Sequence, residues 1–138
     1  MSKNHRVFRL NPKNFAIAPM GLSTKRKDYS LDIQRMCRAN RLGHQHICDV
    51  NGVPLYVAAD AEAAEGQGGF RFRGTKAVTA GIGVLFGRGP GGGLVSAPID
   101  MQWLRSHLVW CTAEEADADK GDEIIVVEES DEVADGSA

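Results

Sequence analysis

Three residues of zinc-binding type occupy alternate positions in one short stretch, His44, His46 and Cys48. Alternate residues of a strand face the same side of a sheet, so a strand here would bring the three side chains together. Imidazole nitrogens and thiolates bind Zn²⁺, and a structural site takes four such ligands. The fourth would have to come from Cys37 or Cys111. One hypothesis is therefore a zinc site; the alternative is that Cys48 is a core residue and the histidines flank a turn.

Two further patterns fall short of catalytic or nucleotide-binding motifs. The glycine-rich segment 66–93 has no Lys-Ser/Thr pair after its glycines, and Phe86 stands where a dinucleotide-binding turn has its third glycine. His107 and Cys111 are four residues apart, but nothing in the sequence orients the histidine or supplies an oxyanion site. We therefore predict that the protein is not an enzyme and takes no cofactor.

Aromatic residues interleaved with arginines suggest a second hypothesis, nucleic-acid binding. The run from Phe70 to Arg73 alternates rings and cations, as a strand does when its rings stack on bases. A basic loop is expected over residues 23–28. The residues of this hypothesis are Lys25, Arg26, Lys27, Phe70, Arg71, Phe72 and Arg73. The alternative is a half-buried edge strand whose arginines lie in water.

Charge is distributed very unevenly along the chain. Residues 1–50 hold ten Lys and Arg against three Asp and Glu, whereas residues 113–138 hold one Lys against eleven Asp and Glu. Opposite charges favour docking. We therefore expect the acidic end to lie against a basic surface, in the same molecule or in a neighbour. The alternative is a solvated acidic tail.

Capping and turn residues divide the chain into elements. Ser30 is the expected N-cap of a helix over 30–42 that stops at Gly43, and Asp100 is the expected N-cap of a helix over 100–111. Asn51-Gly52 between two β-rich runs predicts a hairpin. Strands are expected over 7–10, 15–18, 46–50, 53–59, 70–73, 77–86 and 124–127, with 77–86 as the central buried strand.

The two expected helices carry the surfaces predicted to contact other proteins. Helix 100–111 has an apolar stripe made of Met101, Leu104, Leu108 and Cys111. Two tryptophans seven residues apart widen this stripe, and three arginines follow one side of helix 30–42. Because Trp and Arg are frequent interface anchors, the candidate interface residues are Trp103, Trp110, Arg35, Arg38 and Arg41.

Length and composition fit one α+β domain. The 138 residues contain no apolar run of the roughly 18 residues that a membrane span needs, and the N-terminus lacks a secretory signal. We therefore expect a cytoplasmic protein without a membrane partner. The predicted fold is a small mixed, mostly antiparallel sheet or partly open barrel packed by two helices. It covers residues 1–127, with a basic N-terminal segment, and an acidic low-complexity tail follows over 128–138.

These features predict a structural protein that assembles through protein–protein contacts, as a homo-oligomer or as a subunit of a larger assembly. The concrete class is a bacteriophage virion component: a capsid decoration, head–tail joining or tail subunit. Such a protein would be made in the cytoplasm and end in the virion. RNA or DNA binding is the first alternative and zinc binding the second.

Overall fold

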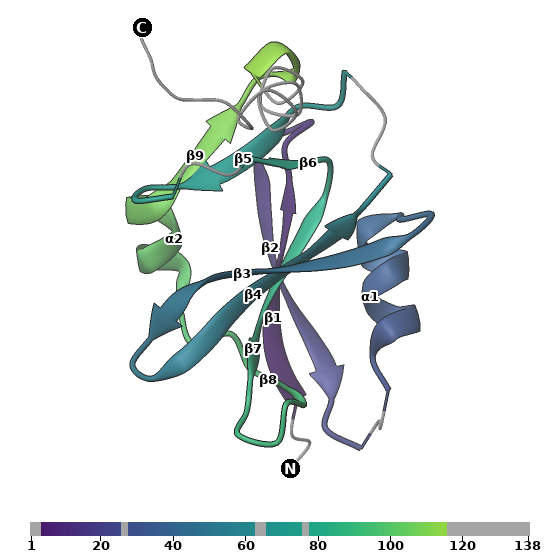
Figure 1. Cartoon of the computed structure of the whole chain (residues 1–138), viewed down its shortest axis with the longest axis vertical. Helices are drawn as coiled ribbons and strands as arrows, with labels where there is room; N and C mark the ends of the chain where they lie inside the picture. Colours follow the sequence, from purple (N-terminus) through teal and green to yellow (C-terminus); the bar gives the residue numbers. More distant parts are fainter. Residues whose placement is uncertain (1–3, 26–27, 63–65, 76–77, 116–138) are drawn as a thin grey trace, which may run out of the picture.

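A computed structural model of the chain describes residues 4–25, 28–62, 66–75 and 78–115 (Figure 1). Its main sheet has the strand order β2-β1-β7-β4-β3, and β8 pairs with β7. The strands are β1 (Asn4–Asn11), β2 (Ala16–Ser23), β3 (Leu42–Val50), β4 (Val53–Asp60), β7 (Gly83–Arg88) and β8 (Leu94–Val95). All their pairings are antiparallel. The strand expected over 124–127, the tail 128–138, Arg26 and Lys27 lie outside the described residues.

A smaller sheet lies beside the main one. Its strands are β5 (Gly69–Phe72), β6 (Thr79–Ala80) and β9 (Leu108–Cys111), in the order β6-β5-β9. The prediction of one continuous strand over 77–86 is therefore wrong in extent. The chain leaves the small sheet after β6 and enters the main sheet at β7, and it changes direction at Gly81, which has a φ of 79°. Its second half, β7, is the central strand of the main sheet, as predicted.

The β3–β4 hairpin confirms the prediction made from Asn51-Gly52. Val50 pairs with Val53, and the two residues between them have φ values of 53° and 81°. Both left-handed values are what a type I′ turn requires, and this turn matches the twist of the flanking strands.

Each face of the main sheet is covered by a different layer (Figure 1). On one face, Phe8, Leu55 and Leu85 pack with Phe70 and Phe72 of the small sheet and with helix α2 (Met101–His107). On the other face, Val7, Val84 and Phe86 pack with helix α1 (Ser30–Cys37). Neighbouring residues of one strand enter opposite clusters, because successive side chains of a strand alternate between faces.

Helix α1 is shorter than predicted, and Ser30 is not its N-cap. Tyr29 occupies the cap position, and its side chain does not cap the helix but donates to the Ser23 carbonyl, while the Ser30 amide donates to Asp28 Oδ1 over 2.9 Å. The helix ends at Cys37 because Arg38 turns left-handed with a φ of 53° and its N–H donates to the Arg35 carbonyl. Gly43, predicted to stop the helix, lies inside β3.

Helix α2 begins as predicted and ends early. Asp100 is its N-cap, and the carboxylate accepts a hydrogen bond from the Trp103 amide over 2.8 Å. The helix stops at His107, and the next four residues form β9, paired with β5 from Gly69↔Cys111 to Phe72↔Leu108. The apolar stripe predicted over 100–111 is therefore shared between a helix and a strand.

The result is a strand-rich mixed fold with antiparallel sheets and helices, consistent with the predicted α+β class. Within the described part of the chain the sheets do not close into a barrel.

Candidate functional site

The H-x-H-x-C pattern does not bring its three side chains together. His46 pairs with Tyr56, and Cys48 pairs with Leu55, the neighbour of Tyr56 on β4. Ile47 is therefore the extra residue of a β-bulge in β3. Cys48 therefore packs toward the cluster under the small sheet, whereas His46 lies against Tyr56 on the opposite face. No three potential metal ligands lie together among the residues that the structure describes. In this arrangement His44, His46 and Cys48 do not form the ligand set that the zinc hypothesis describes.

The other two cysteines do not complete a ligand set either. Cys37 is buried at the end of α1, and its thiol donates to the Ala58 carbonyl over 3.3 Å. Burial raises the pKa of Cys37 to about 12, so the thiol stays protonated at neutral pH. Cys111 is buried in β9, and it does not share a helix with His107 because α2 ends between the two residues.

His44 takes part in a different contact, with Arg88 at the end of β7. The Arg88 guanidinium lies 4.6 Å from the Tyr56 ring centroid and donates to the Gly92 carbonyl and to His44 Nδ1 over 2.8 and 3.0 Å. Because arginine only donates, Nδ1 of His44 must accept, which requires the neutral imidazole. Partial burial, followed by the Arg88 charge, lowers the pKa of His44. Arg88 thereby connects the glycine-rich loop, through the Gly92 carbonyl, to His44 on β3.

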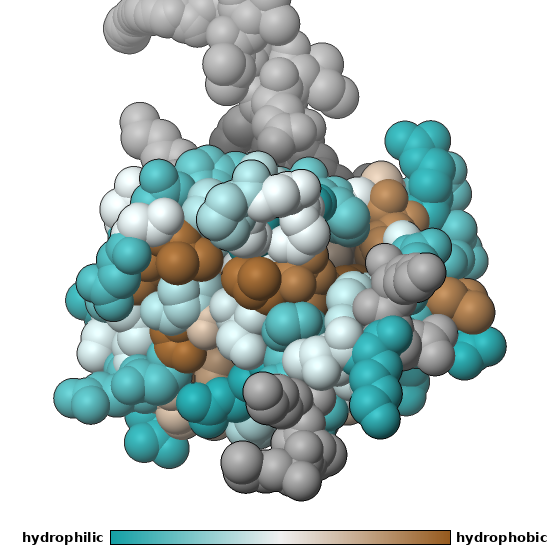
Figure 2. Space-filling view, turned by 90° about the horizontal axis from the view of Figure 1, so that it is seen from below, coloured by the Kyte–Doolittle hydropathy of each residue, from teal (hydrophilic) through white to brown (hydrophobic). Residues whose placement is uncertain are grey.

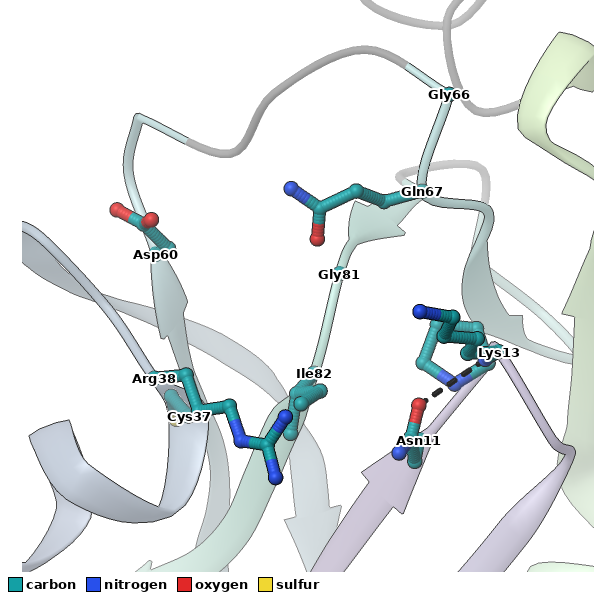
Figure 3. Close-up of a pocket in the computed structure, with 10 residues that line it drawn as sticks. Asn11, Lys13, Cys37, Arg38, Asp60, Gly66, Gln67, Gly81 and Ile82 are labelled. Carbon is teal, nitrogen blue, oxygen red and sulfur yellow. Dashed lines mark hydrogen bonds between the residues drawn. The ribbon is translucent and has the colours of Figure 1, made fainter.

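A cavity of about 380 Å³ opens where β1 and α1 both end (Figure 3). Arg38, Lys13 and Gln67 extend into it from three different segments: the end of α1, the β1–β2 loop and the residues before β5. No described residue forms an ion pair with Arg38 or Lys13. Asp60 lies on the far side, where its carboxylate accepts hydrogen bonds from the backbone of Arg41 and Glu62. We call this feature the cationic cavity.

The three arginines predicted as interface anchors are all exposed, but they do not share one helical face. Arg35 lies in the last turn of α1, and Arg38 follows the helix and points into the cationic cavity. Arg41 precedes β3, where its guanidinium lies 3.7 Å from the carboxylate of Glu62. Of the three, the structure brings only Arg38 together with a second cation, Lys13.

The residues predicted to contact nucleic acid are likewise separated. Phe70 and Phe72 are buried, so their rings form core contacts and have no face open to a base. Arg71 is partly buried and Arg73 exposed beside them. Lys25 is exposed just beyond β2, at the end of the β1–β2 hairpin opposite Lys13. The buried rings and the exposed Lys25 therefore do not form one surface.

The two tryptophans are partly buried and lie in different contacts. Trp103 stacks on His107 at a centroid distance of 4.1 Å and lines a second cavity, of about 460 Å³, together with Cys48. Trp110 lies between buried Phe70 and exposed Phe15, with centroid distances of 6.3 and 5.7 Å. Phe15 is 65% exposed and has a φ of 55°. We call Phe15 and Trp110 the aromatic pair.

Sequence reasoning missed two residues that matter here, Phe15 and Lys13. Phe15 was expected in a strand over 15–18, but it lies in the loop before β2. The turn-forming run Asn11-Pro12-Lys13-Asn14 was the available signal that this segment is a projecting loop.

Comparison of the chain with protein-family models, with curated proteins and with solved structures yields no match. Among the described residues, no helix has the length and apolar character required to cross a membrane.

Proposed function

We propose that this protein is a structural subunit that acts by binding other copies of itself in an assembly, without enzymatic activity. The observation that carries the proposal is the aromatic pair. An exposed phenylalanine held in left-handed backbone is uncommon for a bulky residue. Here its ring rests edge-on against Trp110, at an angle of 62° between the planes.

The position of the aromatic pair suits a contact with a neighbouring molecule. Trp110 belongs to β9, which is one of the two outer strands of the small sheet and pairs only with β5 within the described ranges. Edge strands leave backbone N–H and C=O groups open to another chain. Large aromatic side chains at such an edge supply the apolar area that anchors interfaces.

A second exposed apolar side chain lies on the other side of the molecule. Leu31, on α1, is 50% exposed, and α1 covers the face of the main sheet opposite the small sheet. On the face seen in Figure 2, apolar residues likewise form separate patches divided by polar ones. Contacts on two sides are what a subunit needs to join two different neighbours in a ring or shell.

The class of assembly we propose is a self-assembling particle, and concretely a bacteriophage virion. In it the protein would be a capsid decoration, head–tail joining or tail subunit. This class is supported by the small single domain, the two separated apolar contacts and the opposite charges of the two ends of the chain.

Light scattering of the full-length chain after size exclusion tests the proposal. We expect a mass that rises with concentration above the 14.9 kDa of one chain. Phe15→Ser should weaken self-association about tenfold, a loss of about 1.4 kcal/mol. Asn14→Ser, an exposed change in the same loop, serves as the matched control. A monomer at concentrations up to about 1 mM, or association that Phe15→Ser leaves unchanged, would contradict the proposal.

Nucleic-acid binding stays as a second candidate because Arg35 and Arg38 are both exposed, three residues apart along the chain at the C-terminal end of α1. This candidate predicts binding of single-stranded DNA that weakens steeply with salt, measured by fluorescence anisotropy. The double variant Arg35→Gln and Arg38→Gln should bind with a shallower dependence of log affinity on log salt concentration, by the amount that about two phosphate contacts contribute. Binding that is absent at low salt would remove the candidate.

A further inference from the structure

We propose that the cationic cavity binds the acidic C-terminal segment, residues 116–138, of the same chain. This inference goes beyond the proposed function and does not depend on it. Its basis is the charge of the cavity, the place where the described chain ends and the composition of the segment that follows.

The cavity has the groups that recognise carboxylates. The Arg38 guanidinium presents several N–H donors in one plane, which suits a carboxylate with two oxygens, and Lys13 adds a second positive charge (Figure 3). The Lys13 amide donates to Asn11 Oδ1 over 3.0 Å. Asn11 thereby ties the backbone of the loop that carries Lys13 to the end of β1.

The described chain ends beside this cavity. An added Cβ at Gly68 would lie 3.7 Å from the Cβ of Pro12, which lines the cavity, and 3.8 Å from the Ala113 nitrogen. Thr112 and Glu115 then form reciprocal hydrogen bonds of 2.9 and 3.1 Å, a capping box that starts a helical turn. The described chain therefore passes the residues that line the cavity three residues before the acidic segment starts.

The composition of the segment complements the rest of the chain. Residues 116–138 hold one Lys and nine Asp and Glu, a net charge of −8, whereas residues 1–115 hold fifteen Lys and Arg against nine Asp and Glu, a net charge of +6. Asp117 and Asp119 follow Glu115 by two and four residues, which an extended chain spans in about 7 and 14 Å. These carboxylates therefore follow within six residues of Ala113, where the chain passes Pro12 at the rim of the cavity.

Tethering favours the same chain over a second copy as the source of these carboxylates. A short linker holds its segment at an effective concentration in the millimolar range near its own binding site. The acidic segment of a second copy, present at micromolar concentration, would have to compete with this tethered segment for the cavity. While bound, the segment would also exclude other anions from Arg38 and Lys13.

Zero-length carbodiimide cross-linking of the full-length chain tests the inference, because it joins a lysine to a carboxylate only where the two touch. Lys13 should cross-link to acids of residues 116–138, as found by mass spectrometry of the digested protein. Lys25 is the matched control, since it is exposed at the other end of the β1–β2 hairpin, about 26 Å away along the eight paired residues. An equal mixture of unlabelled and ¹⁵N-labelled chain identifies which chain supplies the acid.

The expected result is a Lys13 cross-link within one isotopic label, several times stronger than any from Lys25. It should be lost at about 1 M NaCl, where the Debye length is about 3 Å. Arg38→Gln should weaken it severalfold and Arg35→Gln should not. Any of three results would overturn the inference: no cross-link at Lys13, an equal yield at Lys25, or cross-linked peptides of mixed label, which would assign the acids to a second copy. The light-scattering mass is measured separately, so failure here leaves the assembly proposal standing.

Discussion

The two faces of the main sheet are covered in different ways, and this decides where the protein is rigid and where it is sensitive to its surroundings. The face under the small sheet and α2 is packed by Phe8, Phe70 and Phe72, all buried. The face under α1 has a single buried phenylalanine, Phe86, with half-exposed Tyr56 and the exposed His44 at its margin. The first face is thus held mainly by buried aromatic rings, whereas the second has a histidine in contact with a charged arginine at its margin.

The largest difference between the faces should appear when a phenylalanine is removed from each. Phe70→Ala should lower the free energy of unfolding by about 3–5 kcal/mol, since the ring is fully buried between the two sheets. Phe86→Ala should cost less, because water can enter from the His44 side. Urea denaturation measures both, with exposed Phe15→Ala as a control that stays within about 0.5 kcal/mol. Equal costs for Phe70 and Phe86 would contradict the distinction.

A methyl group at Gly83 tests how closely the two sheets approach. A Cβ there would overlap the Phe70 ring and touch Val57, so Gly83→Ala should destabilise the protein by about 1–3 kcal/mol. Gly21→Ala on the edge strand β2 is the comparison, because its Cβ would lie 3.3 Å from the side chain of Asn4, which can move aside. Thermal unfolding of both variants gives the two costs, and a neutral Gly83→Ala would mean a looser contact between the layers.

The helices of the two faces should respond differently to loss of their N-terminal polar residue. Asp100→Ala removes the carboxylate that accepts from the Trp103 amide and should cost about 1 kcal/mol. Ser30→Ala should have almost no effect, because the Ser30 hydroxyl does not cap α1. Denaturation midpoints measure both changes. A larger cost for Ser30 than for Asp100 would reverse the assignment of the caps.

Acid should weaken the α1 face through His44, and this is the smallest effect. The pKa of His44 in the folded protein lies below its ordinary 6.5, so the unfolded chain takes up a proton first as the pH falls. Stability from this group is complete above pH 6.5 and declines as the pH falls toward the lowered pKa. His44→Gln should flatten that part of the stability profile, while His46→Gln, which has no Arg88 contact, should preserve it. Identical profiles for the wild type and His44→Gln would contradict this assignment.

Sequence reasoning succeeded where local chemistry decides the structure. Asn51-Gly52 and Asp100 specify a turn and a helix start through their own backbone and side-chain preferences. It failed where pairing with distant strands decides. Residues 108–111 suit a helix by their spacing, yet pairing with β5 makes them a strand. The cationic cavity is lined by residues from three separate segments, and their spacing along the chain does not indicate that they lie close together in the fold.

The extra residue at Ile47 has a consequence for how the β3–β4 hairpin can change in length. The turn at Val50↔Val53 and the far end at Leu42↔Asp60 are one residue out of phase, and the bulge absorbs the difference. Deleting Ile47 would straighten the strand while both ends kept their partners and their orientation. Elsewhere in β3 a deletion would invert every side chain beyond it. Ile47 is thus the position in β3 at which the hairpin can lose a residue while every other side chain stays on its own face of the sheet.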